Sequence, residues 1–186
     1  MIKKYILLIV ILILVSGCIQ QKEIKEIMIP GHGNQVYTFE NDIREALKVK
    51  TNNESGIKEI FLRNDHFNIV FDGSNQQDNA YFRVVLINMA KIPIYFAYDG
   101  RIITFDYYYY IGEQWFNSTD GKITKPELKY PSIWFLGPNT GANETSVNLI
   151  DNVIYLQGTS YKNLTLAGDK LTLIVFGIEK IDNLIY

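Results

Sequence analysis

Hydrophobic positions recur at helical spacing most clearly near the end of the chain. Apolar side chains between Leu164 and Val175 repeat at intervals of three and four residues, the spacing of one helix face. Ser160 is placed to cap this segment, so the pattern predicts a helix that runs to about Phe176. The same spacing predicts two shorter helices, over 42–48 and 56–63.

Other stretches have the composition of β-strands and are bounded by residues that favour turns. "PIYFAYDGRIITFDYYYY" places two β-rich runs around Asp99-Gly100, a dipeptide suited to a two-residue hairpin turn. Asp151-Asn152 divides 147–150 from 153–156 in the same way and predicts a second hairpin. "HFNIVFDG" and "SIWFLGP" predict further strands, each ended by a glycine.

The tyrosine run 107–110 lies in a predicted strand, and its side chains divide between the two faces of that strand. Because successive side chains of a strand point to opposite sides, Tyr107 and Tyr109 share a face with Phe105, whereas Tyr108 and Tyr110 occupy the other. One face is expected to be buried, and the other is expected to be a surface rich in tyrosine.

Together these patterns predict one α+β domain over 35–186. The expected architecture is a mostly antiparallel sheet with hairpins, packed by the C-terminal helix and one or two short helices.

The N-terminal residues have the layout of an export signal. Lys3 and Lys4 precede the apolar run 5–15, and Ser16 and Gly17 lead to Cys18, the one cysteine of the 186 residues. The run falls short of the roughly 20 apolar residues that span a membrane. We therefore expect a signal over 1–17 and a tether over 18–34.

Val15-Ser16-Gly17-Cys18 closely resembles the lipobox of prokaryotic lipoproteins. The resemblance implies cleavage before Cys18, attachment of lipid to its thiol, and a protein held on the extracytoplasmic face of the cell membrane. The alternative is an uncleaved N-terminal membrane helix on a structural component of the envelope.

Charge limits the possible partners, and cysteine content limits how the exported domain can be stabilised. Without Lys3 and Lys4, the 18 basic residues become 16 against 20 acidic ones, a net charge of −4. A domain of this sign has no broad electrostatic reason to bind nucleic acid. With Cys18 lipidated, no thiol remains for disulfides, so the core alone must stabilise the exported domain.

Several motifs that suggest catalysis or cofactors are incomplete. The chain has two histidines, His32 and His66, too few for a zinc site, and Gly31-His32-Gly33 suits a flexible linker. The loop 137–143, "GPNTGAN", lacks the lysine of a phosphate-binding loop. The sequence therefore predicts no catalytic residue, metal or cofactor. A calcium site in "DGSNQQD" is the weaker alternative to a solvated turn, with candidate ligands Asp72, Asn75 and Asp78.

The stretch "DYYYYIGEQWF" carries the remaining candidates for function. Asp106 and Glu113 flank the tyrosines and Trp115, and two carboxylates beside aromatic rings are typical of sugar-binding sites. The favoured interpretation is non-catalytic binding of an envelope protein or glycan through Tyr108, Tyr110 and Trp115. The alternative is a glycan hydrolase that uses the two carboxylates.

Four sequons for N-glycosylation fit an exported glycoprotein; they lie at Asn53, Asn117, Asn143 and Asn163. Three are expected in loops or turns, and the last lies near the start of the C-terminal helix. The sequons, the lipobox and the abundance of Ile, Lys, Asn and Tyr together resemble surface lipoproteins of methanogen-like archaea. The block 131–178 also resembles modules of uncharacterised archaeal proteins, a likeness that implies no activity.

Overall fold

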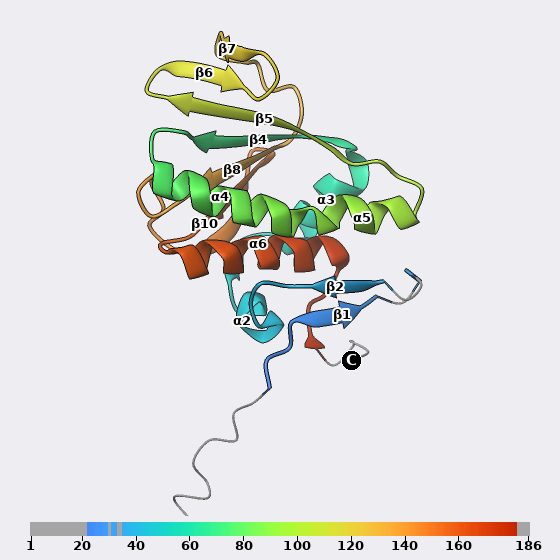
Figure 1. Ribbon diagram of the computed structural model, residues 1–186. Coiled ribbons are helices and arrows are strands. Elements are labelled where there is room, and N and C mark those ends of the chain that lie inside the picture. The colour runs from blue at the N-terminus through green and yellow to red at the C-terminus, as the bar shows by residue number, and fades with distance from the viewer. Residues whose placement is uncertain (1–21, 30, 33–34, 182–186) are drawn as a thin grey trace, which may run out of the picture.

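The chain folds into a mixed α and β structure with helices on one face of a large sheet. The structure is a computed structural model, and it describes residues 22–29, 31–32 and 35–181. A layer of helices covers one face of the sheet, and α2 with the two-stranded sheet β1–β2 lies on the far side of α6 (Figure 1).

The strands are β1 (Glu26–Met28), β2 (Val36–Thr38), β3 (Lys50–Thr51), β4 (His66–Asp72), β5 (Thr104–Ile111), β6 (Gln114–Asn117), β7 (Gly121–Ile123), β8 (Ser132–Leu136), β9 (Ser146–Ile150) and β10 (Val153–Gln157). The helices are α2 (Ile43–Leu47), α3 (Glu54–Arg63), α4 (Gln76–Met89), α5 (Lys91–Tyr98) and α6 (Tyr161–Phe176).

The large sheet is mixed, so the prediction of a mostly antiparallel sheet is wrong. Its order is β3-β9-β10-β8-β4-β5-β6-β7, and the neighbouring strands β10, β8, β4 and β5 run parallel. Parallel neighbours need a long crossover, which α4 and α5 supply between β4 and β5. Antiparallel pairing is found at β9–β10 on one side of this centre and at β5–β6–β7 on the other.

The predicted hairpin at Asp99-Gly100 is also wrong. The residues before it form α5, in which Ile92 and Phe96 are buried at helical spacing, and Asp99 caps the end of that helix. Gly100 does adopt a positive φ of 74°, but in the turn that leads out of the helix. Pro93 has no N–H to continue the hydrogen bonds of α4, which explains why the long helix divides at Ala90.

The other predicted elements are present. Helix α6 begins after Ser160, whose hydroxyl accepts a hydrogen bond from the N–H of Asn163. Asp151 and Asn152 have φ of 48° and 65°, as a two-residue hairpin turn between β9 and β10 requires. Helices α2 and α3 and strands β4 and β8 also lie where the patterns placed them.

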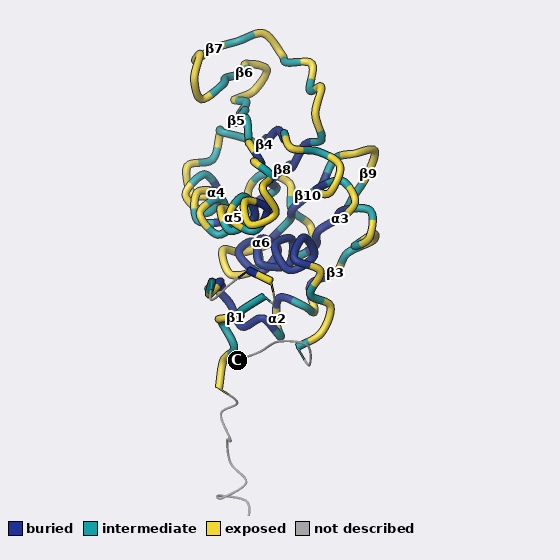
Figure 2. Tube along the Cα trace, turned by 90° about the vertical axis from the view of Figure 1, so that its right-hand side faces the viewer, coloured by how far each residue is buried: buried dark blue, intermediate teal, exposed yellow. Residues whose placement is uncertain are grey.

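Helix α6 is the centre of the core. Every residue of α6 from Leu164 to Phe176 is buried, because α3, α4 and α5, strands β9 and β10, and α2 all pack against it (Figure 2). Burial on every side brings Asp169, Lys170 and Thr172 inside the protein along with the apolar residues.

Asp169 ties this helix to the loop before α2. Its Oδ2 accepts hydrogen bonds from the backbone N–H and the side-chain amide of Asn41, each at 2.9 Å. Its Oδ1 has no partner among the described residues. Burial raises the pKa of Asp169, and the Asn41 hydrogen bonds and the nearby Lys91 charge offset this only in part.

This raised pKa predicts a pH dependence of stability. Above the ordinary value of 3.8, folded Asp169 keeps its proton longer than the unfolded chain does, so its contribution to stability falls as pH rises toward the folded pKa. The free energy of unfolding, measured by urea titration relative to Asp169→Asn, should therefore decrease from about pH 4 upward and then level off. Asp120→Asn, in an exposed turn, is the control. Parallel pH curves for wild type and Asp169→Asn would contradict this account.

The described part of the predicted tether packs into the fold. Strand β1 pairs antiparallel with β2, and Ile27 is buried in the core. His32 is buried as well, with its Nδ1 3.0 Å from the Tyr37 hydroxyl and its ring stacked on Tyr98. His32 is thus a packed residue, not the flexible linker histidine that was expected.

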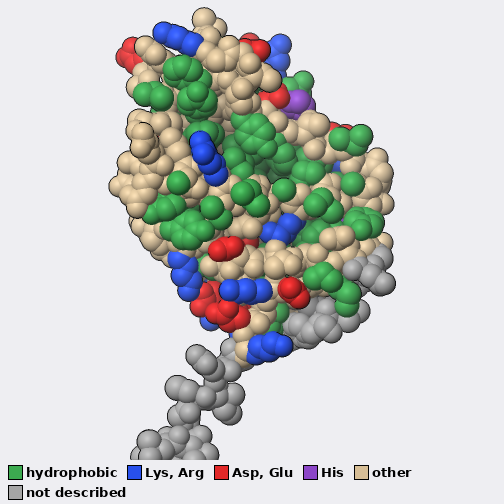
Figure 3. Space-filling view, viewed as in Figure 1, with side chains coloured by type: hydrophobic (Ala, Val, Ile, Leu, Met, Phe, Trp, Pro, Cys, Tyr) green, Lys and Arg blue, Asp and Glu red, His purple; other side chains and the backbone are tan. Residues whose placement is uncertain are grey.

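One stretch of the described chain, Gln76–Tyr98, is long and apolar enough to cross a membrane by length and composition. It comprises α4 and α5, whose inner face supplies Phe82, Val85 and Met89 to the core. Apolar side chains also spread across the middle of the outer face of this part of the molecule (Figure 3). These contacts pack one face of the stretch into the core of the described chain. The predicted signal and Cys18 lie outside the described residues.

Candidate functional site

The face of the large sheet that points away from the helices is the candidate site, and we call it the open face. In β8, Ile133 and Phe135 point into the helix-covered core, so Ser132 and Trp134 point to the open face. The described helices lie on one side of the sheet, and the connection 124–131 returns from β7 to β8 along the other (Figure 2). Val70 is fully buried on the open face, although it does not belong to the core cluster under the helices.

Four aromatic rings form a line across the open face, and we call them the aromatic row. Tyr110 lies 5.2 Å from Trp115 and 6.4 Å from Trp134, which lies 6.2 Å from Tyr155, all between ring centroids. They come from β6, β5, β8 and β10, and each ring is half-buried. The row therefore offers ring surface that the neighbouring side chains hold in place.

The phenol of Tyr110 remains protonated at neutral pH. Burial raises the pKa of Tyr110, and the negative charge of Asp72 raises it further. The hydroxyl can thus donate a hydrogen bond as well as accept one.

The sequence-based candidates Tyr108, Tyr110 and Trp115 all lie on the open face, in the alternation that the strand pattern predicted. Tyr107, by contrast, packs against the core, and Tyr109 stacks between Phe71 and Phe116 on the helix side. Sequence reasoning missed Trp134 and Tyr155. Each alternates with buried residues in "SIWFL" and "VIYLQ", which is a signal that could have placed both on the open face.

The two acidic candidates are far apart. Asp106 lies near the start of β5, and Ile111 at its end is five residues later, roughly 17 Å along a strand. Glu113 lies in the turn beyond Ile111. A glycosidase pair is separated by about 5 to 10 Å, so this geometry does not fit the pair that the hydrolase alternative requires.

Asp106 instead pairs with a histidine that the sequence left without a role. His66 Nε2 lies 2.8 Å from Asp106 Oδ2, and His66 Nδ1 lies 2.8 Å from the Thr104 hydroxyl. The Thr104 hydroxyl also lies 3.2 Å from the carbonyl oxygen of Asp65, an acceptor that competes for its proton. All three side chains are partly or fully exposed, so water reaches this chain of hydrogen bonds.

Tyr130 fastens the end of the connection 124–131 to the open face. Its ring lies 4.3 Å from the His66 ring, and its carbonyl oxygen accepts a hydrogen bond from the Asn68 side chain at 2.9 Å. Asn68 is buried, so this bond also satisfies a polar group of the sheet.

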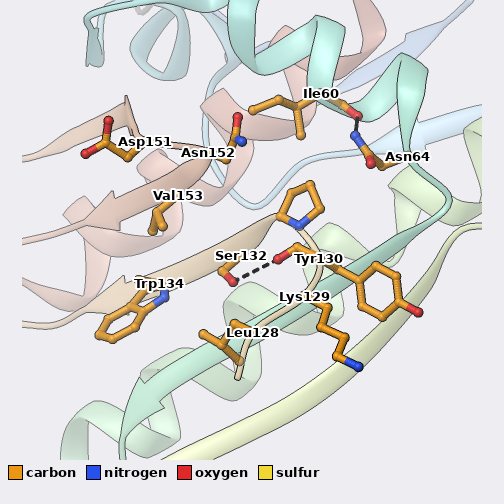
Figure 4. A pocket seen from close by; sticks show the side chains of 11 residues that line it. Ile60, Asn64, Leu128, Lys129, Tyr130, Ser132, Trp134, Asp151, Asn152 and Val153 are labelled. Atoms are coloured by element: carbon orange, nitrogen blue, oxygen red, sulfur yellow. Dashed lines mark hydrogen bonds between the residues drawn. The ribbon is translucent and has the colours of Figure 1, made fainter. Parts of the chain in front are cut away.

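A pocket of about 430 Å³ opens beside the aromatic row (Figure 4). It lies where β8 and β10 begin, between the connection 124–131, the end of α3 and the β9–β10 turn. Its side chains are both apolar and polar, and among them are Leu128, Lys129, Trp134, Asp151 and Asn152. Trp134 belongs to the pocket and to the aromatic row, so the two are continuous.

The residues considered for calcium have local structural roles. Asp72 accepts from the N–H of Ser74, and Asn75 caps α4 by accepting from the N–H groups of Gln77 and Asp78. Buried Asp78 binds the loop 137–143 through the N–H of Asn139 and the hydroxyl of Thr140. The loop "GPNTGAN" thus closes the end of β8 against α4. Within the described chain, no group of three or more His, Cys, Asp or Glu side chains could hold a metal ion.

The four sequon asparagines lie at or near the surface. Asn53 and Asn143 are exposed, and the oxygen of Asn53 caps α3 by accepting from the N–H of Gly56. Asn117 ends β6, where a loop or turn was expected, and is half-buried. Asn163 is half-buried in the first turn of α6, where its amide donates to the Thr159 hydroxyl.

Comparison with known protein families, with curated proteins and with solved structures finds no match to this chain.

Proposed function

We propose that the protein is a membrane-tethered surface lipoprotein that binds glycans of the cell envelope without catalysing their cleavage. The observation that supports this most strongly is the aromatic row. The apolar C–H face of a sugar ring packs on an aromatic ring, whose face carries partial negative charge. A line of such rings suits a chain of sugars better than a single small molecule.

Polar side chains of the open face support a glycan over a protein partner. Asp106 is partly exposed, and so is Asn148, which pairs with Tyr155 of the row. Their neighbours Asn68 and Ser132 are buried and already bonded to the Tyr130 carbonyl oxygen. Sugars need hydrogen bonds from their hydroxyl groups in addition to stacking. The buried centre of a protein interface is, in contrast, depleted of charged groups such as the Asp106 carboxylate.

The proposed membrane anchor is lipid attached to Cys18, and replacing Cys18 tests this part of the proposal. Two acyl or alkyl chains hold a protein far more firmly than one, since each buried CH₂ contributes about 0.8 kcal/mol. We expect Cys18→Ser to move the protein out of the membrane fraction or to leave an unprocessed precursor, as judged by fractionation and mass spectrometry. An intact Met1 and an unmodified Cys18 in the wild-type membrane protein would favour the uncleaved helix instead.

Binding without catalysis is tested on the full chain in detergent. We expect it to retain envelope oligosaccharides on an array and to release no product from them or from common hydrolase substrates. Turnover that disappears in Asp106→Asn or Glu113→Gln would overturn the proposal in favour of a hydrolase. Retention of an envelope protein with no oligosaccharide bound would overturn it in favour of a protein ligand.

A further inference from the structure

We propose that the pocket beside the aromatic row accepts an acidic sugar unit, one that carries a carboxylate in place of a neutral hydroxymethyl group. This inference rests on the proposed glycan binding and names the chemical class that the site selects. Its volume, about 430 Å³, lies within the usual range for pockets that hold small ligands.

The first reason is an unmatched donor in the pocket wall. The indole Nε1–H of Trp134 is buried and has no hydrogen-bond partner among the described residues. An indole N–H can only donate, and a buried donor without an acceptor costs free energy. In Figure 4 the indole nitrogen is on the side of the ring turned toward Ser132 and Leu128. The nitrogen is closed to solvent in the free protein, so an acceptor satisfies it only when a neighbouring side chain such as Leu128 moves aside.

The second reason is a cation at the same wall. Lys129 lines the pocket, is exposed, and makes no ion pair with a described residue. An ammonium group is also a donor without acceptor capacity. In Figure 4 the Lys129 ammonium points away from Trp134, so this exposed side chain must turn back over Leu128 to meet the same ligand group. In that position the two donors favour a group that accepts hydrogen bonds and carries negative charge, as a carboxylate does.

The third reason is that the rest of the lining suits a sugar more than a bare anion. Asp151 and Asn152, held at the β9–β10 turn by their positive φ angles, supply acceptors for hydroxyl groups. Leu128 and the Trp134 ring supply apolar surface for a C–H face. The Asp151 carboxylate disfavours inorganic phosphate or sulfate, which offer few or no donors to that side chain. It also requires that the ligand carboxylate lie toward Trp134 and Lys129, with hydroxyl groups of the sugar facing Asp151.

The test compares linear oligosaccharides of galacturonic acid and of galactose, equal in length, which differ in the carboxylate. Calorimetric titration of the full chain in detergent should show the acidic oligosaccharide binding about tenfold more tightly, the effect of one charge-assisted hydrogen bond. Lys129→Met should abolish this preference, whereas Lys125→Met, a nearby exposed lysine that does not line the pocket, should keep it.

Trp134→Phe separates a ligand contact from a structural role. It keeps an aromatic ring and removes the orphan donor, and this gain offsets the packing lost with the larger ring. We therefore expect little change in the stability of the free protein but weaker binding of the acidic oligosaccharide. A loss of stability without a change in binding would overturn the inference.

The remaining outcomes distinguish the inference from the proposed function. Equal affinity for the two oligosaccharides, with binding that still depends on Trp115, would overturn the acidic preference alone. Inorganic phosphate that competes as strongly as galacturonate would overturn the sugar assignment of the pocket. Binding of neither oligosaccharide, nor of any other glycan, would overturn both.

Discussion

Replacing Gly158 with alanine is expected to destabilise the protein by at least about 3 kcal/mol, because there is no room for a methyl group. Gly158 is buried between β10 and α6, and its N–H donates to the carbonyl oxygen of Leu136. A Cβ at this position would overlap the backbone nitrogen and Cα of Leu164, in the first turns of the central helix. Backbone atoms cannot move aside without shifting α6 itself.

Gly73→Ala is the matched control for this prediction. Its added Cβ would meet the edge of the Tyr109 ring at 2.7 Å, so the closest contact is with a side chain and not with the backbone of a helix. Urea denaturation should show a clearly smaller loss for Gly73→Ala than for Gly158→Ala. A Gly158→Ala variant as stable as wild type would mean that α6 does not approach β10 as closely as described.

A second large effect is expected at the buried lysine of α6. Lys170 has a side chain that is 4% exposed, and its Nζ lies 2.6 Å from Glu54 Oε1 and 3.2 Å from the Leu47 carbonyl oxygen. Glu54→Ala should cost about 3 kcal/mol, because it leaves a buried ammonium without its counter-charge. Lys170→Met should cost less, since it removes the buried charge and keeps the volume of the side chain.

Helix α3, which carries Glu54, also supplies the control for the Glu54–Lys170 ion pair. Glu59 and Arg63 of α3 form an ion pair between side chains that are 55% and 75% exposed, so Glu59→Ala should change stability by less than about 0.5 kcal/mol. The double variant Glu54→Ala with Lys170→Met should recover much of the loss caused by Glu54→Ala alone. Equal losses for Glu54→Ala and Glu59→Ala would contradict the account.

The elements that could be predicted from the sequence are those whose signals are local. Ser160 caps α6 through its own hydroxyl, and Asp151-Asn152 makes the β9–β10 turn through its own backbone angles. The run 91–98 was wrongly predicted as part of a β-hairpin because its aromatic and β-branched residues favour strands. In the structure it forms α5, in which buried Ile92 and Phe96 continue the helical spacing of α4. Tertiary packing of this segment against α6 decided between the two.

Strand order could not be predicted for a related reason. Whether β4 pairs with β5 in parallel depends on the crossover through α4 and α5, and missing those helices led to an antiparallel prediction. Periodicity alone did reveal that Tyr108 and Tyr110 share a face. It did not reveal that Trp134 and Tyr155, from strands much later in the chain, extend that face into a row.

The central claim is that the aromatic row binds glycan, and calorimetric titration of a double variant tests it most directly. Full-length Tyr110→Ala with Trp115→Ala is titrated with the oligosaccharide that wild type binds most tightly. Tyr98→Ala, which removes a tyrosine that is 49% exposed on α5, is the control. We predict a loss of affinity of at least about tenfold in the double variant, since stacked aromatic rings dominate such contacts, and no change in the control. An unchanged affinity in a folded double variant would contradict the claim.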